Sequence, residues 1–215
     1  MTKTSNWSDD YWLMLLQLYL AKPVGLKPVY SRPMVDLALE LHVHPQVLAS
    51  RMSQLAAFQT PRIERLWDQY ADHPEKLKRA VRLMREMKGY GNATEFYDGV
   101  ALNESFEKNF KPVAPGSPWT PVALILVLDL YFRLTPQTMV KETPEVQEMA
   151  RLVKIPVAEV VEVLDIYQHL DPYLNRHDVM LSPMTEPCFD VWHRYGNSDV
   201  ERLAAYAKEL TEYFL

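Results

Sequence analysis

The sequence predicts an all-α protein made of an internally duplicated helical unit that contains a helix-turn-helix. Apolar residues recur at helical spacing along most of the chain. Thr120 and Pro121 stand before one of these stretches, as such residues do at the beginning of a helix. When the chain is shifted on itself by about 112 residues, the same landmarks reappear in the same order, which indicates a repeat.

The landmarks of the repeat are Trp, Leu-Tyr, Pro and a second Trp. The shift aligns Trp7 with Trp119, Tyr19 with Tyr131 and Trp67 with Trp192. Chance likeness between two helical stretches is common, but shared landmarks in one order are rarer, so we expect a duplication. The predicted boundaries are a first repeat over residues 1–88, a connecting segment over residues 89–118 and a second repeat over residues 119–215.

Each repeat opens with a helix whose beginning is marked by a capping residue. Ser8 and Thr120 have hydroxyl oxygens that can accept a hydrogen bond from an amide of the first turn. Trp7, just outside the first cap, is placed to pack on Trp12 as a hydrophobic staple. The second opening helix, "VALILVLDLYF", is apolar on nearly all sides, so we expect it to be buried.

Composition predicts a globular protein of the cytoplasm that does not enter a membrane. Apolar residues make up 48% of the 215 residues, and the apolar blocks are too short to span a bilayer. The N-terminal stretch lacks the features of a signal peptide. The single cysteine, Cys188, excludes an internal disulfide framework and suits a reducing compartment.

Charge is distributed unequally between the two repeats. Residues 1–88 contain 13 Lys and Arg against 9 Asp and Glu, whereas the rest of the chain contains 10 against 19. The first repeat is therefore basic and the second acidic, although the net charge of the whole chain is −5. This asymmetry indicates that the two repeats face different partners.

The middle of the first repeat has the pattern of a helix-turn-helix. Its first helix carries Leu37, Ala38 and Leu41, and a short turn follows at His42 to Pro45. The second helix places Leu48, Met52 and Leu55 on one face. Its other side carries short polar residues and one arginine that suit base edges or phosphates: Gln46, Ser50, Arg51, Ser53 and Gln54. We therefore expect double-stranded DNA as a partner, with ordinary surface residues of a helical protein as the alternative.

A second basic feature follows in "HPEKLKRAVRLMREMK". Lys76, Arg79 and Arg82 recur three residues apart and share one face, opposite an apolar stripe. This face is a candidate ridge for phosphate contacts. The alternative is the solvated outer side of an amphipathic helix.

The corresponding helix of the second repeat has different chemistry. Glu159, Glu162 and Ile166 are predicted to point away from the core, with Asp165 beside them. Carboxylates at this position would repel the phosphates of DNA. We therefore expect the acidic repeat to contact a protein partner or a second copy of the chain.

The second repeat has a Trp-Thr opening, a Leu-Tyr-Phe helix, a segment ending in Leu-Asp-Pro and a Trp-containing segment before an acidic helix. In this order of motifs it resembles the helical accessory domain that precedes the nuclease module in bacterial HNH endonuclease-like proteins. The first repeat matches less closely. Since nothing after the last helix supplies His and Asn for an HNH site, the resemblance implies two tandem accessory domains without the nuclease.

No motif in the sequence supports catalysis. His42 and His44 form an H-x-H pair on a helix end, and His177, Asp178, Cys188 and His193 match no metal-ligand spacing. The sequence contains no glycine-rich phosphate loop and no nucleophile elbow. We therefore expect a non-enzymatic protein without cofactor or metal. The alternative to DNA binding is a protein-interaction scaffold or accessory subunit that never contacts nucleic acid.

Overall fold

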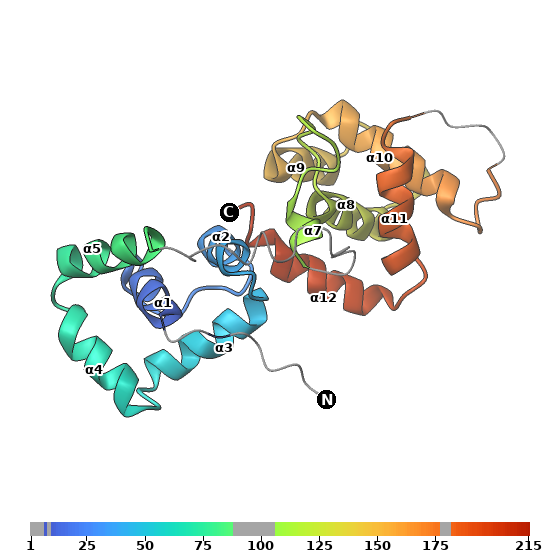
Figure 1. The fold of residues 1–215 in the computed structure, drawn as a ribbon. Coiled ribbons are helices and arrows are strands. Elements are labelled where there is room, and N and C mark those ends of the chain that lie inside the picture. The colour runs from blue at the N-terminus through green and yellow to red at the C-terminus, as the bar shows by residue number, and fades with distance from the viewer. Residues whose placement is uncertain (1–6, 8–9, 88–105, 177–181) are drawn as a thin grey trace. The chain divides into compact units, whose positions relative to one another are not determined.

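The computed structural model is all-helical and divides into two compact units, Met1–Asn103 and Glu104–Leu215 (Figure 1). It describes residues 7, 10–87, 106–176 and 182–215. Within these ranges there is no strand, and no helix is both long and apolar enough to cross a membrane. The predicted all-α class is therefore confirmed.

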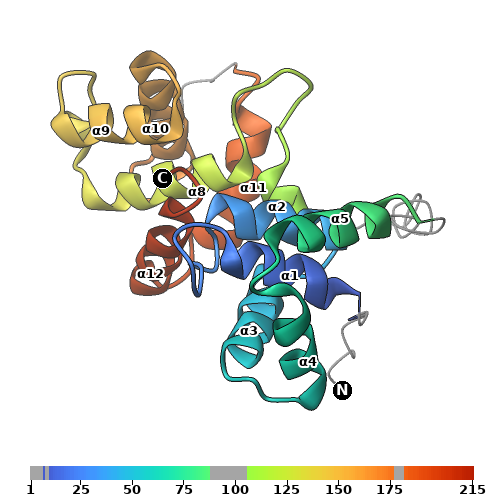
Figure 2. The same cartoon turned by 90° about the vertical axis from the view of Figure 1, so that its left-hand side faces the viewer.

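The N-terminal unit is built around its first helix, α1 (Tyr11–Leu20). The other helices are α2 (Arg32–Leu41), α3 (Pro45–Ala56), α4 (Pro61–Tyr70) and α5 (Pro74–Arg85). All four pack against α1, and each has a proline in its first turn, where the missing N–H leaves no helical hydrogen bond unmade. Figures 1 and 2 show α1 lying between α5 and α3.

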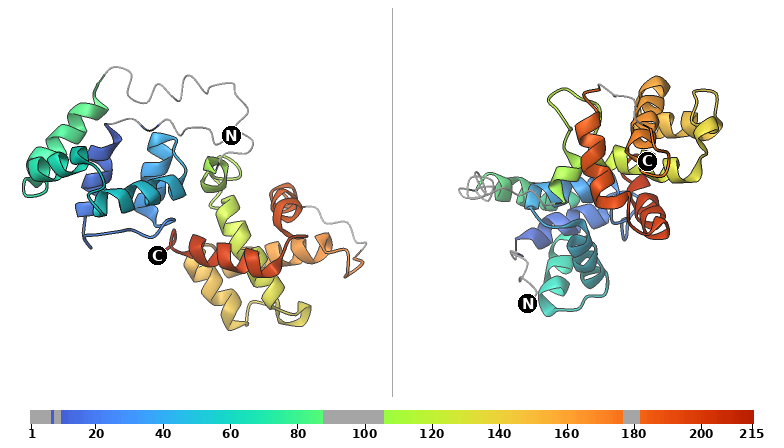
Figure 3. Two further views of the ribbon diagram at one scale, coloured as in Figure 1. Left: turned by 90° about the horizontal axis from the view of Figure 1, so that it is seen from below. Right: turned by 90° about the vertical axis from the view of Figure 1, so that its right-hand side faces the viewer.

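The C-terminal unit is built around α8 (Pro121–Arg133). Its other helices are α7 (Glu107–Phe110), the 3₁₀ turn η1 (Pro136–Thr138), α9 (Pro144–Val153), α10 (Val157–Leu170), α11 (Thr185–Tyr195) and α12 (Val200–Thr211). Every residue from Pro121 to Tyr131 is buried, which confirms the expectation for this apolar helix. Five helices pack on α8, and Figure 3 shows α12 crossing it.

The helices of the two units follow one order. In both units, the opening helix (α1 or α8) packs against the four α-helices that follow it. The turn after the second long helix contains a left-handed residue in each unit, His42 with φ 52° and Lys154 with φ 59°. The amide after each of these residues donates to a carbonyl five residues back, from Val43 to Ala38 and from Ile155 to Ala150. A duplicated unit would produce these parallels, and the duplication itself stays a prediction.

The aromatic landmarks also pack alike in the two units. The rings of Tyr19 and Trp67 meet edge to face with centroids 5.8 Å apart and an interplanar angle of 71°. The rings of Tyr131 and Trp192 meet at 5.8 Å and 73°. The landmarks thus join the opening helix of each unit to its fourth long helix, α4 or α11.

The structure describes one of the two residues that were predicted to cap the opening helices. Thr120 caps α8, because its hydroxyl oxygen accepts from the amide of Ala123 at 3.3 Å. The predicted beginning of the first helix is wrong, because α1 begins at Tyr11 with Asp10, and not Ser8, as its N-cap. Trp7 does contact Trp12, with ring centroids 5.1 Å apart, but it lies three residues before that cap and so is not in the position of a hydrophobic staple. Ser8 lies outside the described residues, as does the part of the connecting segment that precedes residue 106.

Candidate functional site

The first candidate surface is the outward side of α3. His44 precedes the helix as its N-cap, and its Nδ1 accepts from the amide of Gln46 at 3.2 Å. Burial lowers the pKa of His44, which favours the neutral ring that can accept this bond. The predicted inner face is confirmed, since Leu48, Met52 and Leu55 are all at most 1% exposed.

The predicted DNA-contacting residues of α3 lie on its other sides. Gln46 and Ser50 are exposed, while Arg51 and Gln54 are half-buried. Nη1 of Arg51 donates to Oε1 of Gln54 at 3.0 Å, and the guanidinium carbon lies 5.3 Å from the ring centroid of Trp7. Stacking and hydrogen bonding therefore orient Arg51 and leave several of its five N–H donors for another partner.

A loop over residues 21–31 lies against α3, and the sequence patterns do not identify it as part of the surface. The amide of Lys27 donates to the sulfur of Met52 at 3.4 Å. The Lys27 ammonium bonds the carbonyl oxygens of Ala21, at 2.7 Å, and Pro23, so it is folded back on its own loop. Desolvation lowers its pKa. One feature of the sequence could have identified this loop as part of the same surface: residues 11–35 and 41–63 contain no Asp or Glu.

The predicted basic residues of α5 are exposed, but acidic or aromatic neighbours accompany most of the basic side chains there. The ammonium of Lys76 lies 5.2 Å from the ring centroid of Tyr70. Arg82 pairs with Glu86 at 3.8 Å, and Lys78 pairs with Glu75 at 2.9 Å. Arg85 makes a two-pronged contact with Glu40, through distances of 2.7 and 2.8 Å.

The structure does not bring all seven predicted site residues together. Both α3 and α5 bury apolar residues and pack against α1, which lies between them (Figure 2). Their exposed polar residues therefore lie on helices on different sides of α1. The residues of α3, which are Gln46, Ser50, Arg51 and Gln54, form one set, and Lys76, Arg79 and Arg82 of α5 form another.

The corresponding helix of the C-terminal unit, α10, presents bonded carboxylates. Glu159 accepts from the indole N–H of Trp119 at 3.0 Å, and Glu162 accepts from Ser182 at 2.6 Å. Asp165 accepts from Arg176 at 2.6 Å. The outward position expected for Ile166 is wrong, since this side chain is 1% exposed. Three helices, α8, α9 and α11, pack against α10, so they bury more of its circumference than one apolar stripe.

The described residues contain no group of three or more His, Cys, Asp or Glu side chains placed to hold a metal ion. His177 and Asp178 lie outside the described ranges. Cys188 is fully buried, and its pKa is raised to about 12, mainly by that burial and further by Glu162. A thiol in this state is a poor nucleophile at neutral pH.

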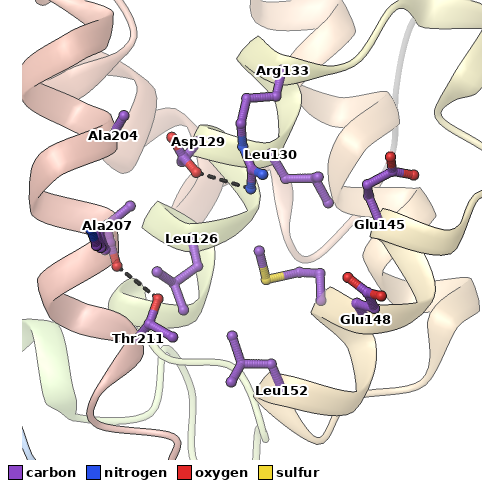
Figure 4. A pocket seen from close by; sticks show the side chains of 12 residues that line it. Leu126, Asp129, Leu130, Arg133, Glu145, Glu148, Leu152, Ala204, Ala207 and Thr211 are labelled. Carbon is purple, nitrogen blue, oxygen red and sulfur yellow. Dashed lines mark hydrogen bonds and ion pairs between the residues drawn. The ribbon is translucent and has the colours of Figure 1, made fainter.

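A cavity of about 510 Å³ opens in the C-terminal unit between α8, α9 and α12 (Figure 4). Its floor is apolar and its edge carries charged side chains from all three helices. Among the lining residues, Asp129 of α8 is buried, with 9% of its surface exposed. The sequence patterns treat this residue only as part of an apolar helix.

Comparison with protein-family models, curated proteins and solved structures finds no match for this chain. The resemblance to the accessory domain of HNH endonuclease-like proteins therefore stays a prediction.

Proposed function

We propose that the N-terminal unit binds double-stranded DNA, with α2 and α3 as a helix-turn-helix and α3 as the helix that enters the major groove. The observation that carries the proposal is the composition of α3 and the 21–31 loop. Both lack carboxylates, and α3 exposes short polar side chains beside one oriented arginine. Such a surface offers hydrogen bonds to base edges without repelling phosphates.

Arg51 is the central contact in this proposal. Its stack on Trp7 and its bond to Gln54 hold the guanidinium in one orientation, so little side-chain entropy is lost on binding. A planar fork of donors suits a phosphate or the major-groove edge of guanine. Gln46 and Ser50, exposed one helical turn apart, supply the neutral contacts.

The comparison between α3 and α10 supports the same division of roles. Both helices follow a turn that contains a left-handed residue, but α10 presents Glu159, Glu162 and Asp165. Carboxylates at a DNA surface would be desolvated opposite phosphates of like charge. The proposed role of the C-terminal unit is therefore association with a protein or with a second copy of the chain, and we propose no enzymatic activity for either unit.

Fluorescence anisotropy with a labelled mixed-sequence duplex at low salt tests the proposal. Arg51→Glu should weaken binding by at least tenfold, because it removes one favourable contact and adds a like charge opposite phosphate. The matched control is the Arg79→Glu and Arg82→Glu double variant on α5. It changes more charge on a helix that lies on a different side of α1 from α3, and it should weaken binding less than Arg51→Glu does.

Two results would overturn the α3 interface. One is the absence of any binding at low salt. The other is an Arg51→Glu variant that binds like the original protein while the α5 double variant does not. The second result would instead place the contact on α5.

A second candidate function is a protein-interaction scaffold without nucleic-acid contact. The pairing of Arg82, Lys78 and Arg85 with acidic residues favours it, because paired cations attract phosphate less. Sedimentation equilibrium of the full chain provides its test. A concentration-dependent dimer, with no DNA binding at low salt, supports the scaffold; a monomer that binds DNA contradicts it.

The proposal includes an origin by duplication and a kinship with accessory domains of bacterial HNH endonuclease-like proteins. The matched aromatic pairs Tyr19–Trp67 and Tyr131–Trp192 support the duplication. The proposal also includes a cytoplasmic location, which the single cysteine, Cys188, supports because it suits a reducing compartment. The neighbouring genes test the kinship: a nuclease or methylase beside this gene supports it, and an unrelated operon argues for an independent regulator.

A further inference from the structure

The cavity between α8, α9 and α12 has an apolar floor and a polar edge (Figure 4). The floor is lined by Leu126, Leu130, Met149, Leu152, Ala204 and Ala207. Its volume of about 510 Å³ lies within the usual range for sites that hold small organic molecules. The floor therefore suits the hydrocarbon part of a ligand.

Asp129 is the buried polar group of this cavity. Its Oδ2 pairs with Arg133 at 3.1 Å, but its Oδ1 is buried and has no hydrogen-bond partner among the described residues. A buried carboxylate oxygen without a donor is unfavourable, so a donor from a ligand would stabilise it. Asp129 itself lines the cavity, and the last torsion of an aspartate side chain is broad enough for the carboxylate to turn toward a ligand.

The rest of the edge adds acceptors rather than buried donors. Glu145 and Glu148 of α9 are exposed at one side of the cavity. The hydroxyl of Thr211 donates to the carbonyl of Ala207 at 3.0 Å, which leaves its oxygen as an acceptor. The cations of the lining, Arg133 and Lys208, are both exposed, and Arg133 is already paired with Asp129.

We propose that this cavity binds a small apolar amine, with its ammonium group on Asp129 and its hydrocarbon part on the leucine and methionine floor. An ammonium group has three donors, which match the surplus of acceptors, and its charge compensates a carboxylate that Arg133 only half satisfies. Glu145 and Glu148 raise the local concentration of cations at the entrance. This site lies within the C-terminal unit and does not depend on DNA binding.

Isothermal titration calorimetry of the full chain without DNA tests the proposal. The probes are phenethylamine, hexylamine and phenylbutylamine, with phenethyl alcohol and hydrocinnamate as neutral and anionic counterparts of similar shape. At least one amine should bind, and the alcohol and the acid should each bind at least about tenfold more weakly, because neither places a positive charge on Asp129.

Two variants locate the site. Asp129→Asn should weaken amine binding about tenfold, and the affinities for the amine and for the alcohol should become more similar. Ala204→Phe should abolish binding by filling the cavity from the half-buried side of α12, with Asp129 left in place. Glu201→Gln is the control, since it removes an exposed carboxylate of α12 that does not line the cavity, and it should leave binding unchanged.

The outcomes separate clearly. Amine binding that is lost in Ala204→Phe and kept in Glu201→Gln supports the proposal even if Asp129→Asn fails to fold. The proposal is overturned if no amine binds, if the alcohol binds as tightly as the amine, or if Ala204→Phe binds normally. A loss of DNA binding has no bearing on any of these results.

Discussion

The hydroxyl of Tyr131, near the end of α8, donates a hydrogen bond of 2.5 Å to Oδ2 of Asp171, the residue that follows α10. The other oxygen of Asp171 accepts from the amide of Tyr173 at 2.9 Å. Burial first, and then the contact with Asp171, raise the pKa of Tyr131 well above its ordinary value of 10.0, so the hydroxyl remains a donor. The Leu-Tyr landmark of the repeat and the Leu-Asp-Pro segment of the second repeat therefore meet in space.

Tyr131→Phe should lower the free energy of unfolding of the C-terminal unit by about 2 kcal/mol, the usual value for a hydrogen bond to a charged group. Urea denaturation followed by circular dichroism measures the change. Tyr173→Phe is the control, since this side chain is 91% exposed and its hydroxyl should contribute little. Equal stability of the two variants would show that the Tyr131–Asp171 bond contributes nothing.

Gly196→Ala should destabilise the same unit, because Gly196 lies directly against an indole ring. A methyl group at this position would be 2.5 Å from Cδ2 of Trp192 and 2.8 Å from its carbonyl oxygen. Moving a ring that is 6% exposed and packed against Tyr131 should cost about 1–3 kcal/mol. Thermal unfolding measures this, and Asn197→Ala, at an exposed neighbouring residue, should unfold at the original temperature.

The stability of the N-terminal unit should fall in mild acid because of His44. Its folded-state pKa is below the ordinary 6.5, so the unfolded chain binds the proton first. The contribution is complete above pH 6.5 and is lost as the pH falls from 6.5 through the lower folded-state pKa. This contribution of His44 to the free energy of unfolding should be about 1 kcal/mol, the usual value for an N-cap.

His44→Asn separates the cap from the titration, because asparagine accepts the same bond from Gln46 without gaining a proton. Urea midpoints measured on both sides of pH 6.5 should differ less in this variant than in the original protein. An unchanged pH dependence would assign the effect to another group.

Cys188 should resist alkylation in the folded protein. Its side chain is fully buried, and with a pKa of about 12 almost none of it is thiolate at neutral pH. Iodoacetamide followed by mass spectrometry should modify it only after denaturant unfolds the C-terminal unit. Rapid modification under native conditions would show that this region opens readily.

The helices and their inner faces could be predicted from the sequence because their causes are local. The 3.6-residue period, the Thr-Pro beginning of α8 and the stripe of Leu48, Met52 and Leu55 all depend on residues close together in the chain. The outward position of Ile166 could not be predicted by the same rule, since helices that are distant in sequence bury it.

The sequence alone determined the all-α class, the order of the helices and the contrast between a basic first half and an acidic second half, since composition and periodicity carry this information. Only the tertiary structure decided which polar faces share a surface. It placed α3 and α5 on different sides of α1, so that Arg51 and Arg82 belong to separate faces. It also buried Asp129 at the edge of a cavity formed by three helices. Both results depend on how remote helices pack, and a helix pattern records only which side of each helix is apolar.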